Sequence, residues 1–345
     1  MTQTQPTRAT PRGVRAGDVV RVRSKDEILA TLDADGRLAG HPFMPEMLQF
    51  AGRELPIYKI AHKTCDTVNP MADKRKLDHT VHLTGARCDG SAHGGCQAEC
   101  LLFWREEWLE TPAGDQLRPP QQEQSPVATE ATLHEDTVAG VDADGETLYR
   151  CSATELVKAS TRLPSYEIGQ YIEDVRTRNY GLLYVLHGLL ILAFNKFQVL
   201  SRKLPRRLRI ADGSTYPFYG GTGPGPKAEP LGLQLGELVE VRSQEEIERT
   251  LDANNKNRGL YFDAELLQFC GRRARVVKKI EKIIEEPTGR MLRLRDCVIL
   301  EQFVCQGLYH RFCPRAIHIY WREAWLRRVD ETGPAKATTN GSSAG

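Results

Sequence analysis

An internal repeat constrains the fold of this 345-residue chain more than any other feature of its sequence. Residues 17–53 align with residues 236–272 without a gap, and 19 of the 37 aligned positions are identical. Further along, CDGSAHGGC meets CQGLYHRFC, and FWREEWL meets YWREAWL, in the same order. Two matched stretches in one order indicate a duplicated structural unit. We therefore predict two copies of one module, at residues 17–110 and 236–329.

Local patterns predict short strands and a helix in each copy. An alternating stretch opens each copy, and the S-x-x-E pattern that follows it is typical of a capped helix start. In the second copy, residues 275–284 and 291–304 flank a Glu-Pro-Thr-Gly turn, and this pattern predicts a hairpin. The pattern favours an α+β chain with two small SH3-like β-barrels or rolls flanking a helical insert.

Composition assigns the remaining segments. Stretches rich in Pro, Gln, Thr and acidic residues bury too little apolar surface to fold, and Gly/Pro-rich stretches typically connect domains. We predict a flexible N-terminus at 1–16, a disordered linker at 111–147, a helical insert at 148–205, a Gly/Pro-rich tether at 206–235 and a disordered tail at 330–345.

Copy one carries a dense set of cysteines around one histidine. Cys88, His93, Cys96 and Cys100 lie close together in a polar, glycine-rich stretch, and Cys65 lies upstream. A structural zinc ion takes four Cys or His ligands in a tetrahedron, and glycines let the backbone bend tightly around an ion. Single cysteines are often small core residues, but this density in a polar loop favours metal ligands.

Copy two keeps only part of this set. It has Cys305, His310 and Cys313, but isoleucine stands at the positions of Cys65 and Cys100. Three ligands and an open fourth position are the arrangement of catalytic zinc. The alternative is a partly lost site that is kept for packing, and the sequence leaves both interpretations open.

Cys297 is a further candidate ligand in copy two. If residues 297–305 form one strand, Cys297 and Cys305 lie about 26 Å apart, because a strand rises about 3.3 Å per residue. That separation is too large for one ion. Either the strand turns, or Cys297 belongs elsewhere.

Zinc is the expected metal, and iron or an iron–sulfur cluster is the alternative. Cys65, Cys88, Cys96 and Cys100 would supply the four thiolates that a cluster needs. Their spacing matches neither common ferredoxin pattern, and a histidine inside the loop favours zinc.

The cysteines and the apolar segments also bear on location. Residues 1–16 are polar and have no apolar signal-peptide core, and the longest apolar run, residues 182–194, is shorter than the ~20 residues of a membrane span. Nine cysteines in such a chain indicate a reducing compartment. We therefore expect a cytoplasmic protein without a transmembrane segment.

Two basic runs, at residues 202–209 and 272–279, and four tryptophans suggest other partners. The net charge of +2 gives no global basic field, which disfavours nucleic acid. The apolar segment before the first run could lie on an anionic membrane, but packing against the modules or a partner chain is favoured. All four tryptophans lie at equivalent positions of the repeat, which favours core packing over a ligand platform: Trp104, Trp108, Trp321 and Trp325.

Some of these stretches resemble known sequences. RCDGSAHGGCQAECLLFWREEWL, VCQGLYHRFCPRAIHIYWREAWL and the TEL-x4-T segment at 154–161 resemble those of uncharacterised bacterial proteins with the same duplicated Cys/His module. This resemblance implies no activity, only that His310 and Cys313 belong to a recurring loop. The opening GDVVRV resembles the first strand of SH3-like barrels such as those of nitrile hydratase accessory chains, which concerns the fold alone.

Together these features favour a tandem zinc-binding β-barrel protein that acts as a binding, scaffolding or accessory module. A protein partner or small molecule would bind at the cleft between the modules. One alternative is a metalloenzyme with an open site at Cys305, His310 and Cys313, and a second is a nucleic-acid-binding barrel protein. Because no P-loop, G-x-S-x-G or H-E-x-x-H motif is present, catalytic residues are not assigned and enzymatic activity stays open.

Overall fold

The computed structural model describes residues 13–66, 73–119, 128–221, 223 and 229–329. Residues 1–12 of the flexible N-terminus predicted at 1–16, and the tail predicted at 330–345, lie outside the described residues. The chain divides into two compact units, one made of residues 1–218, 281–294 and 304–318, the other of residues 219–280, 295–303 and 319–345. Residues 281–294 and 304–318 come from the predicted second copy but belong to the first unit.

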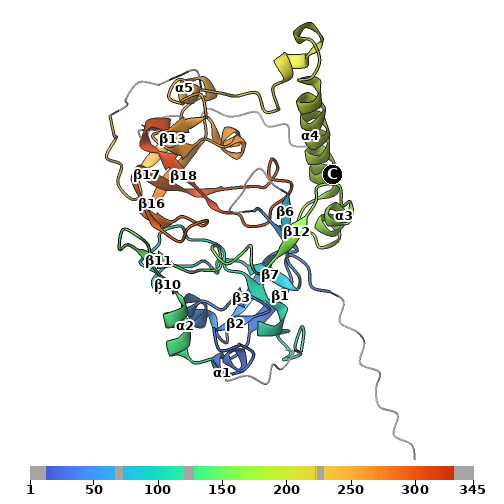
Figure 1. Ribbon diagram of the computed structural model, residues 1–345, viewed down its shortest axis with the longest axis vertical. Coiled ribbons are helices and arrows are strands. Elements are labelled where there is room, and N and C mark those ends of the chain that lie inside the picture. The colour runs from blue at the N-terminus through green and yellow to red at the C-terminus, as the bar shows by residue number, and fades with distance from the viewer. Residues whose placement is uncertain (1–12, 67–72, 120–127, 222, 224–228, 330–345) are drawn as a thin grey trace, which may run out of the picture. The chain divides into compact units, whose positions relative to one another are not determined.

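Each predicted copy contributes a five-stranded sheet, and the strand order is the same in both (Figure 1). The first sheet has the order β8 (Trp104–Arg105), β7 (Thr80–Leu83), β4 (Glu54–Ile60), β1 (Val19–Val22) and β9 (Leu109–Glu110). The second has the order β18 (His318–Arg322), β17 (Met291–Val304), β16 (Arg273–Ile284), β13 (Leu238–Val241) and β19 (Leu326–Arg328). The opening strand of each copy pairs antiparallel with both of its neighbours.

The smaller elements complete an α+β protein, and no closed barrel is formed by the described residues. The short sheets are β2 (Arg37–Leu38) with β3 (His41–Pro42), β14 (Lys256–Asn257) with β15 (Leu260–Tyr261), β10 (Val138–Val141) with β11 (Thr147–Tyr149), and β12 (Thr161–Leu163) with β6 (Lys74–Lys76) and β5 (Lys63–Thr64). The helices are α1 (Lys25–Leu29), α2 (Glu130–Asp136), α3 (Gly169–Arg176), α4 (Leu182–Ser201) and α5 (Gln244–Glu248). Short 3-10 helices include η1 (Pro45–Phe50) and η5 (Ala264–Phe269).

Helices α1 and α5 begin where the sequence predicts. Ser24 accepts a hydrogen bond from the backbone N–H of Glu27, and the Glu27 carboxylate accepts one from the backbone N–H of Ser24. Ser243 and Glu246 form the same reciprocal pair at α5. Such capping boxes satisfy backbone donors that a helix start otherwise leaves unpaired. Both helices nevertheless end after five residues.

Each sheet covers a core built around two tryptophans. Trp104 and Trp108 are fully buried in the core of the first sheet, and Trp321 and Trp325 are fully buried in that of the second. The burial of the four tryptophans agrees with the prediction that they pack in the core and do not form a ligand platform. The tryptophans do not share a helix face, because the segments form a strand that runs into a 3-10 turn.

The segment predicted as a linker, residues 111–147, contains described structure. Thr129 caps α2, and β10 pairs antiparallel with β11. Leu133 of α2 is buried, and a Cβ atom on Gly36 would lie 2.6 Å from its side chain. Ala128 is buried with Leu133 in the core of the first sheet, so a few apolar side chains order a stretch whose composition is polar.

The helical insert is joined to the first sheet by buried polar contacts. The Asn179 side chain donates to the backbone oxygen of Ile60 and accepts from its N–H, both at 2.8 Å. Lys63 and Asp174 form an ion pair in which both side chains are fully buried. Burial raises the pKa of Asp174 to about 7, although the Lys63 ammonium lowers it. Removal of either partner would leave an unpaired buried charge, which is costly.

Helix α4 is the one helix in the described part of the chain that is long and apolar enough to cross a membrane, judged by length and composition. It has 20 residues, and 22% of its most apolar window is buried. The sequence favoured packing of this helix against the modules or a partner chain. In the structure only one side of the helix is covered. Val185 and Ile191 are buried, whereas Leu183 and Leu190 are exposed.

We predict that Thr31→Val and Thr250→Val each destabilise the protein by about 1–3 kcal/mol. The buried indole N–H of Trp108 donates to the Thr31 hydroxyl at 3.1 Å, and that of Trp325 donates to the Thr250 hydroxyl at 3.0 Å. Valine leaves each indole without its acceptor. Urea unfolding followed by tryptophan fluorescence measures the change. Exposed Thr161→Val is the control, and equal midpoints for all three variants would contradict the prediction.

Candidate metal centre

The CDGSAHGGC loop turns back on itself at Gly90. Gly90 has a φ of +74°, and a Cβ atom there would lie 2.0 Å from the carbonyl oxygen of Cys96. Its own carbonyl accepts hydrogen bonds from the N–H groups of His93 and Gly95, at 3.2 and 2.9 Å. Only glycine fits this close approach. The turn brings the two ends of the loop together, with their cysteines.

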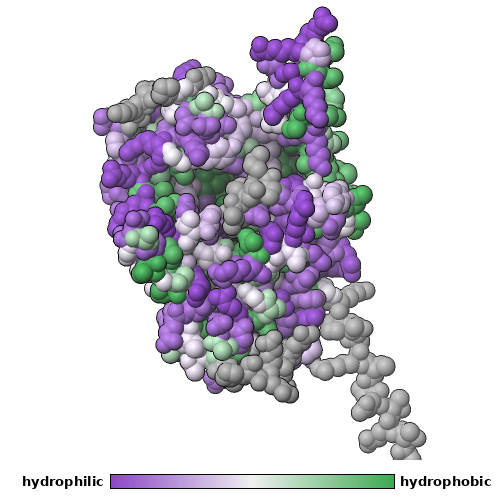
Figure 2. Space-filling view, in the orientation of Figure 1, coloured by the Kyte–Doolittle hydropathy of each residue, from purple (hydrophilic) through white to green (hydrophobic). Residues whose placement is uncertain are grey.

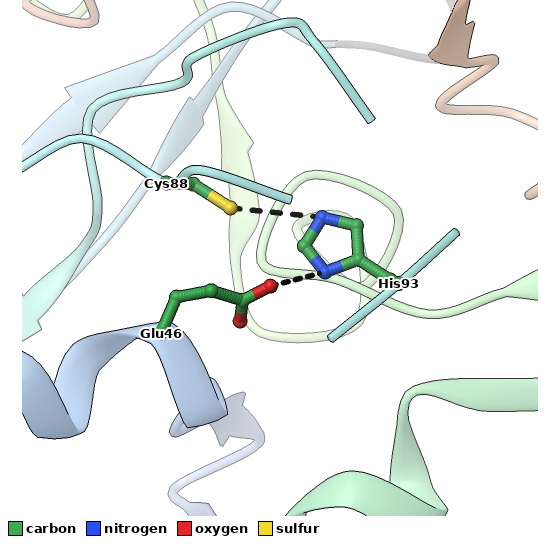
Figure 3. Close-up of side chains that lie close together, drawn as sticks. All are labelled: Glu46, Cys88 and His93. Carbon is green, nitrogen blue, oxygen red and sulfur yellow. Dashed lines mark hydrogen bonds and ion pairs between the residues drawn. The ribbon is translucent and has the colours of Figure 1, made fainter. Parts of the chain in front are cut away.

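His93 lies between Cys88 and Glu46, and one ring nitrogen faces each of them (Figure 3). Its Nε2 is 3.6 Å from Cys88 Sγ, and its Nδ1 is 2.9 Å from Glu46 Oε1. The ligand atoms of the three residues all lie within 4.8 Å of one another. Nδ1 thus lies at ion-pair distance from the carboxylate, and Nε2 is the ring nitrogen that faces Cys88. Metal-binding histidines are oriented by carboxylates in this way.

Burial and pairing set the charges of this group. Burial alone lowers the pKa of His93, but hydrogen bonds with Cys88, Cys96 and Glu46 raise it well above its ordinary value. Burial raises the pKa of Glu46, yet His93 lowers it overall. Glu46 is positioned by η1 and also accepts the N–H of Ala92 at 2.9 Å. The imidazole is therefore held in one orientation in a nearly closed space.

The Cys96 sulfur is positioned by backbone N–H groups. It accepts the N–H of Ile284 at 3.3 Å, and that of Ala98 also points to it. Burial raises the pKa of Cys96, but His93 and these two N–H groups outweigh burial and lower it. The loop also contacts the end of β16, since Gln97 N–H donates to the Lys282 carbonyl at 3.0 Å. Donors directed at a sulfur favour the thiolate, which is the form that binds metal.

Two further cysteines border the same space. A pocket of about 40 Å³ is lined by Cys88, His93, Cys96, Cys100 and Cys151, among other residues. Burial raises the pKa of Cys100 and of Cys151, so both are neutral thiols without a cation. A bound metal ion would reverse this preference, because coordinated thiols lose their protons. The pocket thus offers four sulfurs and one imidazole.

Sequence reasoning missed Cys151 as a member of this cluster. The residue lies three positions before the TEL-x4-T segment, which the resemblance includes, and that closeness was the available signal. The four-thiolate set predicted for a cluster was Cys65, Cys88, Cys96 and Cys100. The structure places Cys151 at the first loop. Cys65 follows β5 and instead lies beside Cys313.

The second loop, CQGLYHRFC, has the same backbone arrangement as the first. The Gly307 carbonyl accepts the N–H groups of His310 and Phe312, at 3.2 and 2.7 Å. Gly307 has a φ of +79°, and a Cβ atom there would lie 2.7 Å from the Cys313 carbonyl oxygen. Cys305 Sγ is 3.4 Å from His310 Nδ1. A second Cys/His group of metal-binding character therefore lies in the first unit.

Cys297 does not extend this group. It lies inside β17, which runs unbroken from Met291 to Val304, and its thiol donates to the Arg295 carbonyl at 3.3 Å. Burial raises its pKa to about 11. The sequence separated Cys297 from the metal ligands if it lies on one strand leading to Cys305, and β17 runs through Cys297 to Val304. These contacts are those of a buried thiol in a strand.

Comparison of the chain with protein families, with curated proteins and with solved structures gave no match.

We predict that Glu46→Gln weakens zinc binding by about 10- to 100-fold, because it removes the carboxylate that orients His93. Competition against a chromogenic chelator measures the affinity of the purified protein. Exposed Glu135→Gln, in α2, is the control with the same chemical change. Unchanged zinc affinity in Glu46→Gln would show that Glu46 is not the partner of a ligand.

Proposed function

We propose that this chain is a metal-stabilised binding protein in which zinc occupies the first cluster and fixes the local fold. The observation that carries the proposal is the position of His93, whose two ring nitrogens face the Cys88 sulfur and the Glu46 carboxylate (Figure 3). Cys88, Cys96 and His93 would supply three ligands, and Cys100 or Cys151 the fourth. We also propose that the two sheets of equal strand order derive from one duplicated SH3-like roll.

A structural role is favoured over catalysis at this cluster because the ligands are enclosed. His93 is 2% exposed and Cys96 is 7% exposed. Structural zinc sites are closed, whereas catalytic sites keep a position for water or substrate. In small modules the metal supplies folding free energy directly, because the unfolded chain holds no preformed site.

An iron–sulfur cluster is the second candidate, favoured by the four cysteines that line one pocket. Cys88, Cys96, Cys100 and Cys151 would supply the four thiolates. The paired histidine supports zinc instead, since imidazole with a carboxylate partner is a common zinc ligand. The two candidates differ in their absorption of visible light.

The binding surface in this proposal is the exposed side of α4. Leu183, Leu190 and Phe197 follow one another at intervals of seven residues, which places them on one helix face, and they are 79%, 70% and 48% exposed. Apolar side chains gather along α4, and hydrophilic ones cluster at the end of the segment (Figure 2). Residues 202–209 hold five basic and no acidic residues. This combination supports contact with an anionic membrane surface.

The first test is metal content and absorption of protein purified without oxygen, with Cys96→Ser as the variant. We predict a colourless zinc protein, and a Cys96→Ser protein with about one ion fewer per chain and a lower Tm. The control is Cys270→Ser, a half-buried cysteine of the second unit. A brown wild-type protein would favour the iron–sulfur cluster. Metal-free wild-type protein with an unaltered Cys96→Ser melting curve would contradict the proposal.

We predict that the protein sediments with vesicles that contain anionic lipid and that Leu183→Ser/Leu190→Ser reduces this binding at least about tenfold, because two exposed leucines no longer enter the lipid. Val141→Ser is the control, since it removes an apolar side chain that is 69% exposed in β10. Equal binding to neutral vesicles would exclude the basic segment from a role. A monomeric wild-type protein that stays in the supernatant would contradict the proposal, and a dimer broken by the double variant would assign α4 to a second copy.

A further inference from the structure

We infer a second metal centre in which Cys65, from the first copy, completes the set Cys305, His310 and Cys313 of the second copy. One zinc ion would then join the segment after β5 to the loop after β17. The inference rests on the proposed function in taking zinc as the metal, but it concerns other residues and can fail separately. All four residues belong to the first unit.

The first support is an exchange between the two copies. The Cys96 sulfur of the first loop accepts the N–H of Ile284 at 3.3 Å, and the Cys313 sulfur of the second loop accepts the N–H of Cys65 at 3.2 Å. Ile284 and Cys65 are equivalent positions of the repeat. Each loop therefore receives its donor from the hairpin region of the other copy. Only at the second loop does that donor residue carry a thiol.

The second support is the chemistry of the assembled groups. Cys305 Sγ lies 3.4 Å from His310 Nδ1, and Cys65 meets Cys313 through its backbone. The equivalent turns at Gly90 and Gly307 give both loops the same backbone course, and each brings a histidine ring nitrogen to the first cysteine: Nε2 in the first loop and Nδ1 in the second. Three cysteines and one histidine are a common structural zinc set. The fourth position, which the sequence left open for a water molecule, would be filled by Cys65.

The third support is a buried positive charge beside the sulfurs. Lys74 is 3% exposed, and its Nζ donates to Cys65 Sγ at 3.3 Å. A lysine ammonium is rarely buried without an anionic partner. Zinc with three thiolates and one neutral imidazole carries a net charge of −1 by addition, and Lys74 would offset it.

The fourth support is the rigidity of the surroundings. Lys63, two residues before Cys65, is held by its ion pair with Asp174, and its Nζ lies 5.3 Å from the centre of the Phe312 ring. The Tyr180 hydroxyl donates to the Cys313 carbonyl at 3.0 Å. The two segments that would share the ion are therefore already in contact and aligned. Ligands held by packing and hydrogen bonds bind metal without a large ordering cost.

A metal at this position would close a very long loop. Cys65 and Cys305 are separated by 305 − 65 = 240 positions in the sequence. Cross-links that close long loops reduce the entropy of the unfolded chain the most. The ion would tie residues 304–318 to the segment of the first copy that contains Cys65, within the first unit.

The test is zinc stoichiometry of the full-length protein, purified without oxygen, in four forms: wild type, Cys65→Ser, Cys96→Ser and Cys270→Ser. We expect two ions per chain in wild type and in Cys270→Ser, and one ion in each of the other two. Hydrogen exchange should show residues 304–318 opening faster in Cys65→Ser but not in Cys96→Ser. Cys65→His, which keeps a ligand, should restore both the second ion and the slow exchange.

Full zinc content and unchanged exchange in Cys65→Ser would overturn the inference and leave the first cluster untouched. Loss of zinc in Cys65→Ser but not in Cys96→Ser would instead contradict the proposed function. If Cys65→Ser does not fold, cadmium-113 NMR of the wild-type protein decides. The cadmium chemical shift distinguishes a site of three thiolates and one imidazole from a site with only two thiolates. A Cys65–Cys313 disulfide in the anaerobic wild-type protein, seen by mass spectrometry, would also overturn the inference.

Discussion

The hydrogen bonds from backbone N–H groups to the sulfurs of Cys96 and Cys313 are the contacts on which the arrangement of the first unit depends. Each donor comes from the opposite copy: Ile284 N–H for Cys96 and Cys65 N–H for Cys313. Neither loop can therefore complete its surroundings within its own copy. Together with contacts such as the Tyr149 N–H to the Gly289 carbonyl and the Arg87 side chain to the Ala316 carbonyl, these bonds connect residues 281–294 and 304–318 to the rest of the first unit.

The features that were predictable from the sequence are those set by short-range rules. The capping boxes at Ser24 and Ser243 and the hairpin of β16 and β17 each depend on residues that are close in the sequence. The burial of the four tryptophans also followed from the repeat, because duplicated modules keep the packing of their cores. Helices α3 and α4 lie within the segment that was predicted as a helical insert. Patterns of this kind need no knowledge of the rest of the chain.

The ligand sets were not predictable in the same way, because they depend on contacts between distant segments. An alignment of the repeat assigns Cys65 to the first loop, yet its N–H bonds a sulfur 248 positions away. Cys151 lies outside both copies, so no comparison of the copies could place it at the first cluster. Composition also failed for part of residues 111–147, where Ala128 and Leu133 pack in the first core. In each case a tertiary contact outweighed the local pattern.

The two clusters differ in a complementary manner, which argues against a simple decay of the second one. Where the first loop meets Ile284, the second meets Cys65, and where the first copy has Cys100, the second has Ile317. Ile284 is 6% exposed and lines the first pocket, so it shields that cluster from water and supplies no ligand. The first loop must then draw its remaining ligand from Cys100 or Cys151, close to its own copy. In our inference the second loop obtains its remaining ligand from Cys65, across the repeat. If both hold zinc, the first ion would stabilise one module, and the second would make the fold of one copy depend on the presence of the other.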